Sequence, residues 1–266
     1  MGSTSATTSS DLLSRHLATL AARGRRALVT YITAGHPSPD ATVTLMRVLE
    51  SSGADVIEVG LPFSDPMADG PVIQASSQSA LSQGVTFDRT LELIGKAAVS
   101  IPVVLFSYLN PVLAAGTSAL ERAAAAGAHG LLITDLPVGA DPALEQRFGA
   151  GPLAFVRLVA PTTPVERMRE IAAHGRGFVY LISRLGVTGA REDLASDLPD
   201  VVARLRQVTS MPVCVGFGVS TPEQARSLGQ LADGIVVGSA VVRAAQEGPV
   251  AVERLVRSLR GALDEA

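Results

Sequence analysis

Eight short apolar runs, spaced along most of the chain, are the feature that most limits how it can fold. They read ALVTYIT, DVIEVG, PVVLFSY, GLLITD, LAFVRLV, GFVYLIS, PVCVGFG and GIVVGS. The segments between them have helical spacing; in residues 40–54, apolar positions recur every three or four residues until Gly53. Near-continuous apolar strands joined by helices indicate a parallel sheet covered on both faces. Eight such units in 266 residues predict an α/β fold, a single (β/α)8 TIM barrel.

The ends of the chain add two elements to this barrel. The first ten residues, MGSTSATTSS, have neither the basic flank nor the apolar segment of a secretory signal. We expect residues 1–10 to be a disordered leader and residues 11–266 to form a single TIM-barrel domain that starts with an N-terminal helix. After the last apolar run, GSAVVRAA predicts a short extra helix. The uncharged residues 97–120 are long enough to cross a bilayer, but Pro102 and Pro111 interrupt them, which favours a strand and a loop.

The charge and the cysteine content exclude several functions. The net charge is -3, from 22 basic and 25 acidic residues, and no run of Lys or Arg is present. Binding to nucleic acid or to an anionic membrane is therefore not expected. The single cysteine, Cys214, forms no internal disulfide and fits a buried strand position in a reducing cytoplasm. The four histidines show no metal-ligand spacing with Cys214 or with one another, so we expect no metal site.

Glu58 stands in the middle of the second apolar run, where a charged residue needs an explanation. Alternation along a strand places Glu58 with Val56 on one face, and Ile57 with Val59 on the other. We expect Glu58 to face the barrel interior, because its apolar neighbours suit packing against helices. Loss of hydration raises the pKa of a buried carboxyl, which suits proton transfer near neutral pH. The alternative is a structural ion pair, with Arg157 as its partner.

A second acid, Asp69, follows eleven residues later in the loop after this run. In barrel enzymes the loops after the strands form the catalytic face, so Asp69 is placed to face Glu58 across a cavity. Two acids in different environments divide acid, base and electrostatic roles between them. The alternative is that ADGP is only a turn, in which the aspartate caps the following helix.

Glycine-rich corners after the last three runs indicate an anion site. Backbone N–H groups there, together with the N-terminus of the extra helix, form the phosphate site of many barrels, and Ser239 adds a hydroxyl donor. Neither a P-loop nor a G-x-G-x-x-G pattern is present. An alternative interpretation of Ser220, Thr221 and Pro222 is the start of a helix. The three corners are GVTGA (residues 186–190), GFGVST (216–221) and VGSAVV (237–242).

Six motifs together resemble the tryptophan synthase alpha subunit family, over residues 28–242. They are IEVGLPFSDPMADGPVIQ, SYLNP, LVAPTT, GFVYLISRLGVTGAR, GFGVSTPEQ and ADGIVVGSAVV. The resemblance implies cleavage of indole-3-glycerol phosphate to indole and glyceraldehyde 3-phosphate. This is a retro-aldol carbon–carbon lyase reaction that uses no metal, Schiff base or organic cofactor in this subunit.

The resemblance also implies a role for individual residues. Glu58 matches the general acid/base that protonates indole C3 and helps to deprotonate the side-chain hydroxyl. Asp69 matches the carboxylate that stabilises positive charge at the indole N–H. The implied substrate pocket contains Tyr31, Tyr108, Tyr180 and, on a closing loop, Thr188. The implied phosphate-binding residues are Gly189, Gly218, Gly238 and Ser239. For Tyr108 and Tyr180, packing within the barrel is an equally good interpretation.

The family also implies a partner, a beta subunit that carries pyridoxal phosphate (PLP) and receives indole through a tunnel in an α2β2 complex. The loop around Asp65 and the SYLNP segment would form the contact. His36 and Val138 differ from residues common in the family. Two other classes stay open: a stand-alone indole-releasing lyase, and a non-catalytic phosphate-binding barrel or a sugar-phosphate isomerase.

Overall fold

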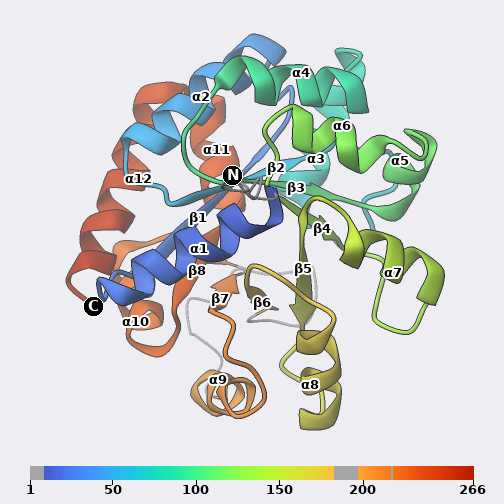
Figure 1. Cartoon of the computed structure of the whole chain (residues 1–266). Helices are drawn as coiled ribbons and strands as arrows, with labels where there is room; N and C mark the ends of the chain where they lie inside the picture. The colour runs from blue at the N-terminus through green and yellow to red at the C-terminus, as the bar shows by residue number, and fades with distance from the viewer. Residues whose placement is uncertain (1–8, 183–196, 217) are drawn as a thin grey trace, which may run out of the picture.

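A closed barrel of parallel strands forms the centre of the protein, as the apolar runs predict. The computed structural model describes residues 9–182, 197–216 and 218–266. Neighbouring strands pair in sequence order and β8 pairs with β1, which closes the sheet (Figure 1). The α/β fold and the TIM barrel are therefore confirmed. The strands are β1 (Ala27–Thr33), β2 (Val56–Gly60), β3 (Val103–Ser107), β4 (Gly130–Ile133), β5 (Ala154–Val159), β6 (Val179–Ile182), β7 (Val213–Gly216) and β8 (Gly234–Val237).

Helices follow the strands and lie around them, and α11 is the predicted extra helix (Figure 1). Several begin at a residue whose side chain accepts a hydrogen bond from the first turn, which satisfies a backbone N–H without a helical partner. The helices of the described chain are α1 (Ser9–Ala22), α2 (Pro39–Ser51), α3 (Pro71–Ser82), α4 (Phe87–Ala97), α5 (Leu109–Ala114), α6 (Ala119–Ala125), α7 (Pro142–Ala150), α8 (Val165–Ala173), α9 (Leu198–Arg206), α10 (Pro222–Leu231), α11 (Ser239–Glu247) and α12 (Pro249–Asp264).

Helix α1 closes one end of the barrel. Its apolar residues Leu13, Leu17 and Leu20 belong to the same buried cluster as interior strand residues such as Val104 and Cys214. Leu13 also lies against Gly130, the first residue of β4, and Gly177, just before β6, where a larger residue would displace it. These contacts place α1 at the ends where the strands begin. The opposite end, where the strands finish and the longer loops start, is left for a binding site.

The alternation predicted for β2 is confirmed. Val56 belongs to the interior cluster, whereas Ile57 and Val59 belong to the cluster between the sheet and the helices. Glu58 is 1% exposed and shares the parity of Val56, so its side chain faces the interior. Cys214 is a buried free thiol, as expected. The fold thus surrounds one carboxyl group with apolar side chains.

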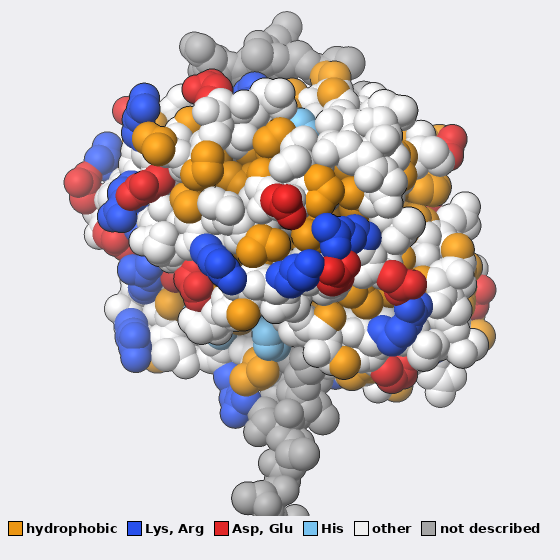
Figure 2. Space-filling view, turned by 90° about the horizontal axis from the view of Figure 1, so that it is seen from above, with side chains coloured by type: hydrophobic (Ala, Val, Ile, Leu, Met, Phe, Trp, Pro, Cys, Tyr) orange, Lys and Arg blue, Asp and Glu red, His pale blue; other side chains and the backbone are white. Residues whose placement is uncertain are grey.

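The surface and the chain ends bear on the remaining expectations. Residues 1–8 of the expected leader lie outside the described part, and α1 begins at Ser9. Residues 97–120 form the end of α4, then β3, α5 and the start of α6. Within the described ranges, we find no helix with both the length and the apolar character needed to cross a bilayer. The face in Figure 2 intersperses basic and acidic side chains, in line with the small net charge.

Candidate active site

Glu58 is a buried acid that forms no ion pair with any residue of the described ranges. Its Oε1 atom has no hydrogen-bond partner among the described residues. Burial therefore raises the pKa of its carboxyl group to about 8. The alternative pairing with Arg157 is wrong, because Arg157 shares the outward face of β5 with Phe155 and lies over that ring. Its Nη2 atom instead donates to Oε2 of Glu145 at 3.1 Å.

Asp69 is held by a tyrosine and does not cap a helix. Helix α3 begins after Gly70, which provides no side-chain cap, so the turn interpretation leaves the carboxylate of Asp69 unused. The Tyr108 hydroxyl donates to Asp69 Oδ2 at 3.1 Å and accepts from the backbone N–H of Ala68 at 2.9 Å. Burial raises the pKa of Asp69 to about 6, and the hydrogen bond from Tyr108 opposes part of that rise. The loop carboxylate is thus fixed in orientation by β3.

The charges of Glu58 and Asp69 affect the pKa of the same tyrosines, so the two acids lie near one another. Burial raises the pKa of Tyr31 and of Tyr180, and the charges of Asp69 and Glu58 raise both further. Tyr31 lies directly opposite Glu58 in the ladder between β1 and β2. Burial and the charge of Asp69 likewise raise the pKa of Tyr108. The structure therefore brings together Glu58, Asp69 and the three tyrosines expected in the pocket.

An apolar wall accompanies these polar groups. Tyr31 packs with Ile73 of α3 and Val242 of α11 in one buried cluster. Phe106 meets the Tyr31 ring edge to face, with 5.3 Å between the ring centroids, and Phe63 lies 5.1 Å from the ring of Tyr108. A flat aromatic ligand suits such a wall. These four residues were missed from the sequence; the alternation of β3 pointed to Phe106, whereas no local pattern indicates the others.

The glycine corners lie partly within the described chain. Gly238 precedes α11 and Ser239 is its first residue, so free N–H groups of the first helical turn lie there. A Cβ atom added to Gly238 would lie 3.7 Å from Cβ of Tyr31, which places this helix start beside one of the pocket tyrosines. Gly218 has φ +89°, a conformation that favours glycine. Thr188 and Gly189 lie outside the described residues.

The start of α10 uses two of the backbone N–H groups that could have bound an anion. Thr221 accepts from the N–H of Gln224 at 3.3 Å, and the Gln224 side chain accepts from the N–H groups of Ser220 and Thr221. The helix-start interpretation is confirmed, with Pro222 in the first turn. Because these two N–H groups already have partners, the donors without a local partner belong to other positions of the corner and to α11.

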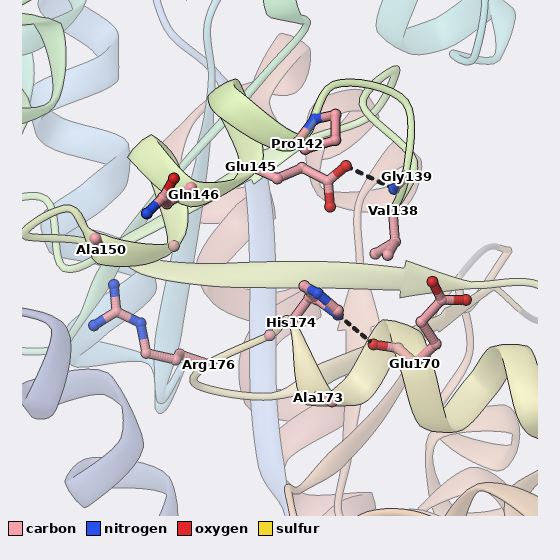
Figure 3. A pocket seen from close by; sticks show the side chains of 12 residues that line it. Val138, Gly139, Pro142, Glu145, Gln146, Ala150, Glu170, Ala173, His174 and Arg176 are labelled. Atoms are coloured by element: carbon pink, nitrogen blue, oxygen red, sulfur yellow. Dashed lines mark hydrogen bonds between the residues drawn. The ribbon is translucent and has the colours of Figure 1, made fainter.

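A separate cavity of about 620 Å³ lies on the outer wall, between α7 and α8 (Figure 3). Its lining includes Glu145, which accepts from the N–H of Gly139 at 2.6 Å and also pairs with the buried arginine of β5. None of the expected site residues lines it. Within residues 9–182, 197–216 and 218–266, no group of three or more His, Cys, Asp or Glu side chains is arranged to hold a metal ion. The barrel end with Glu58 is the better candidate, because unpaired buried acids mark chemistry more often than satisfied ion pairs do.

Known proteins share this sequence and fold. A family model described as "Tryptophan synthase alpha chain" matches residues 17–263. The tryptophan synthase alpha chain of Laribacter hongkongensis is 46% identical over 260 residues, which cover 95% of this chain and 98% of that protein. Among solved structures, Mycobacterium tuberculosis tryptophan synthase is 37% identical with a TM-score of 0.88, and 94% of this chain and 97% of that chain are covered. The tryptophan synthase subunit alpha of Legionella pneumophila is 34% identical with a TM-score of 0.85, over 98% of this chain and 100% of that one. The matched residues, the identity and the barrel agree, and the chain belongs to the tryptophan synthase alpha chain family.

Proposed function

We propose that this protein is a carbon–carbon lyase that cleaves indole-3-glycerol phosphate to indole and glyceraldehyde 3-phosphate. The observation that carries the proposal is Glu58, a buried acid with no cation beside it in the described part of the chain and a pKa raised to about 8. Membership of the family supports the choice of substrate. A structural ion pair would have needed a partner that Glu58 lacks among the described residues.

The two acids differ in protonation at neutral pH, which assigns their roles. Because the pKa of Glu58 is about 8 and that of Asp69 about 6, Glu58 mainly keeps its proton at pH 7 and Asp69 is mainly ionised. Glu58 donates its proton to indole C3, and positive charge moves to the ring nitrogen. The Asp69 carboxylate then stabilises the N–H that carries this charge.

The same carboxylate completes the reaction. After Glu58 has given its proton to C3, it accepts the proton of the chain hydroxyl next to the ring. The carbon–carbon bond breaks, the hydroxyl carbon becomes the aldehyde, and the bonding electrons return to the ring to give neutral indole. No redox partner is needed, and Glu58 ends in its starting protonation state.

The phosphate is assigned to the opposite rim. Gly218, Gly238 and Ser239 offer backbone N–H groups near the ends of β7 and β8, and the N-terminus of α11 favours negative charge. Gly189 completes the phosphate assignment by family resemblance, and Thr188 is assigned to the substrate pocket, on a closing loop. Tyr31, Tyr108 and Tyr180 would line the space between the phosphate and the acids.

A beta subunit is the proposed partner, in an α2β2 complex in the cytoplasm. We assign PLP to that partner, because the reaction above needs only acid–base groups of this chain. The loop between β2 and α3 supports an interface, since Met67 is 86% exposed there and Leu113, just after SYLNP, is 39% exposed. Large exposed apolar side chains next to a site are typical of a docking surface.

Indole release tests the proposal directly. The chain contains no Trp, so the protein adds no indole fluorescence of its own; because the substrate also carries an indole ring, released indole is first extracted into an organic solvent and then measured by fluorescence. Glu58→Gln and Asp69→Asn should each lose most of the turnover while they still bind inorganic phosphate. Undiminished release from Glu58→Gln would contradict its role. Addition of a beta subunit separates a dependent alpha subunit, whose rate rises, from a stand-alone lyase, whose rate does not change.

A further inference from the structure

A chain of three buried hydroxyl groups links Tyr31 to helix α3. The Tyr31 hydroxyl lies 3.2 Å from Oγ1 of Thr33, which lies 2.6 Å from Oγ of Ser76. Ser76 in turn donates to the backbone oxygen of Ile73 at 2.7 Å. Tyr31 is 6% exposed, and Thr33 and Ser76 are each 1% exposed. Water therefore does not compete for these bonds.

The chain has one direction in which every bond is made. A carbonyl oxygen only accepts, so the Ser76 proton points to Ile73 and Ser76 must accept from Thr33. The single proton of Thr33 is then used, and Thr33 must accept from Tyr31. Reversal at any position would lose one of three buried hydrogen bonds, which is costly where no water replaces it. The Tyr31 proton thus points to Thr33, and only lone pairs of its oxygen remain for another partner.

Packing holds the Tyr31 ring in the same place. An ideal Cβ on Gly60 would overlap the Tyr31 hydroxyl oxygen, so the ring leans over β2 at the only residue type that leaves room. Phe106 packs against the ring at an interplanar angle of 80°. Tyr31 also lies opposite Glu58 in the ladder. Its oxygen is therefore fixed in position as well as in polarity.

We propose that Tyr31 determines substrate specificity as a fixed hydrogen-bond acceptor, and that Thr33 and Ser76 are positioning residues that set its polarity. The inference rests on the proposed function. It assigns to Tyr31 the second hydroxyl of the glycerol chain as donor, because the indole N–H is assigned to Asp69 and the hydroxyl next to the ring to Glu58. A substrate with a hydrogen-bond acceptor at that point would place its lone pairs against those of the Tyr31 oxygen, and it would bind poorly.

Variants of the hydroxyl chain test this role through kcat/KM for indole-3-glycerol phosphate. Tyr31→Phe removes the acceptor, and Thr33→Val removes the group that holds the Tyr31 proton while keeping nearly the same shape. Each should lower kcat/KM by about 5- to 30-fold, the range for one lost or misdirected hydrogen bond. Thr33→Ser keeps the hydroxyl and should stay close to the parent. Thermal unfolding of every variant checks that the barrel is intact.

The double variant separates positioning from simple structural support. If Thr33 acts through the Tyr31 hydroxyl, Thr33→Val should cause no further loss of kcat/KM in the Tyr31→Phe background. Equal losses in both backgrounds would mean that Thr33 acts independently, and would overturn the inference. So would an unchanged kcat/KM in Tyr31→Phe. An absence of indole release by the parent protein is a different result, because it rejects the proposed function itself and this inference with it.

A second probe checks the assigned donor. Indole-3-propanol phosphate retains the ring N–H but has neither chain hydroxyl. Its binding should be the same for the parent and Tyr31→Phe, while kcat/KM for the full substrate falls in the variant. Binding that is about 5- to 30-fold weaker in Tyr31→Phe would mean that the N–H donates to Tyr31, and would overturn the assignment of the chain hydroxyl.

Discussion

Replacement of Glu58 by Gln should stabilise the fold, and the gain should grow with pH. The pKa of Glu58 rises from 4.5 to about 8 on folding. Each unit corresponds to about 1.4 kcal/mol, so full ionisation costs the folded state at most about 5 kcal/mol. Below pH 4.5 both states are protonated and the cost is absent. Between pH 4.5 and 8 the unfolded chain has lost a proton that the folded chain keeps, so stability falls by about 1.4 kcal/mol per pH unit. Above pH 8 the loss is complete.

Urea unfolding of the parent and Glu58→Gln, followed by circular dichroism from pH 5 to 9, measures this difference. The amide has a similar shape and does not titrate, so its other effects should be independent of pH. The free-energy difference should increase by about 3 to 4 kcal/mol between pH 5 and 8 and then level off. Glu121→Gln, on an exposed helix position, controls for the loss of one charge. A difference that stays constant from pH 5 to 9 would refute the burial argument for Glu58.

Further predictions concern groups around the site and on the outer wall. The plot of kcat/KM against pH should be bell-shaped, because activity needs ionised Asp69, with a pKa of about 6, and protonated Glu58, with a pKa of about 8. Tyr108→Phe removes a donor to the Asp69 carboxylate, so the acidic limb should move to higher pH. Gly60→Ala should lower kcat/KM about tenfold or more with little change in the pH limbs, because the new methyl group displaces the tyrosine of β1. Glu145→Ala leaves the buried Arg157 without the carboxylate that it pairs with. The free energy of unfolding should fall by about 3 kcal/mol, with unchanged activity per folded molecule.

Each of these has a control or a contrary outcome. An acidic limb that is unmoved in Tyr108→Phe would show that the hydrogen bond does not hold the Asp69 charge. For Gly60→Ala, the urea midpoint tells a local displacement from a loss of fold. Glu166→Ala breaks an exposed ion pair with Arg169, so its effect on stability should stay below about 1 kcal/mol.

The barrel and the orientation of Glu58 were predictable because they depend on local periodicity. A period of two along β2 is enough to separate Val56 and Glu58 from Ile57 and Val59, and eight such strands leave few ways to close a sheet. The partner of Arg157 was not predictable in this way. It is paired with Glu145 of α7, and only the packing of that helix against β5 brings the two together.

The contacts of the hydroxyl chain were also only partly predictable from the sequence. Tyr31 and Thr33 share a face of β1 by alternation, so their proximity follows from the sequence. Ser76 lies 43 residues further on, in a helix whose rotation and position depend on the preceding loop. Ile73 and Val242 approach Tyr31 from two different helices for the same reason. Strand period assigns a residue to a side of the sheet, but contacts between a strand and a helix depend on how the helix is docked.

The division of labour between the two acids follows from where the fold places them. Burial raises the pKa of both, to about 8 for Glu58, which is 1% exposed, and to about 6 for Asp69, which is only half-buried. Glu58 lies on a strand inside the barrel, where no described donor compensates. Asp69 lies on a loop that crosses the end of β3, where the Tyr108 hydroxyl, itself held by Ala68, donates to the carboxylate. Shallower burial and one donor at the loop position keep Asp69 mainly ionised at pH 7, whereas deeper burial keeps Glu58 mainly protonated. Burial and hydrogen bonding together therefore separate proton transfer from charge stabilisation.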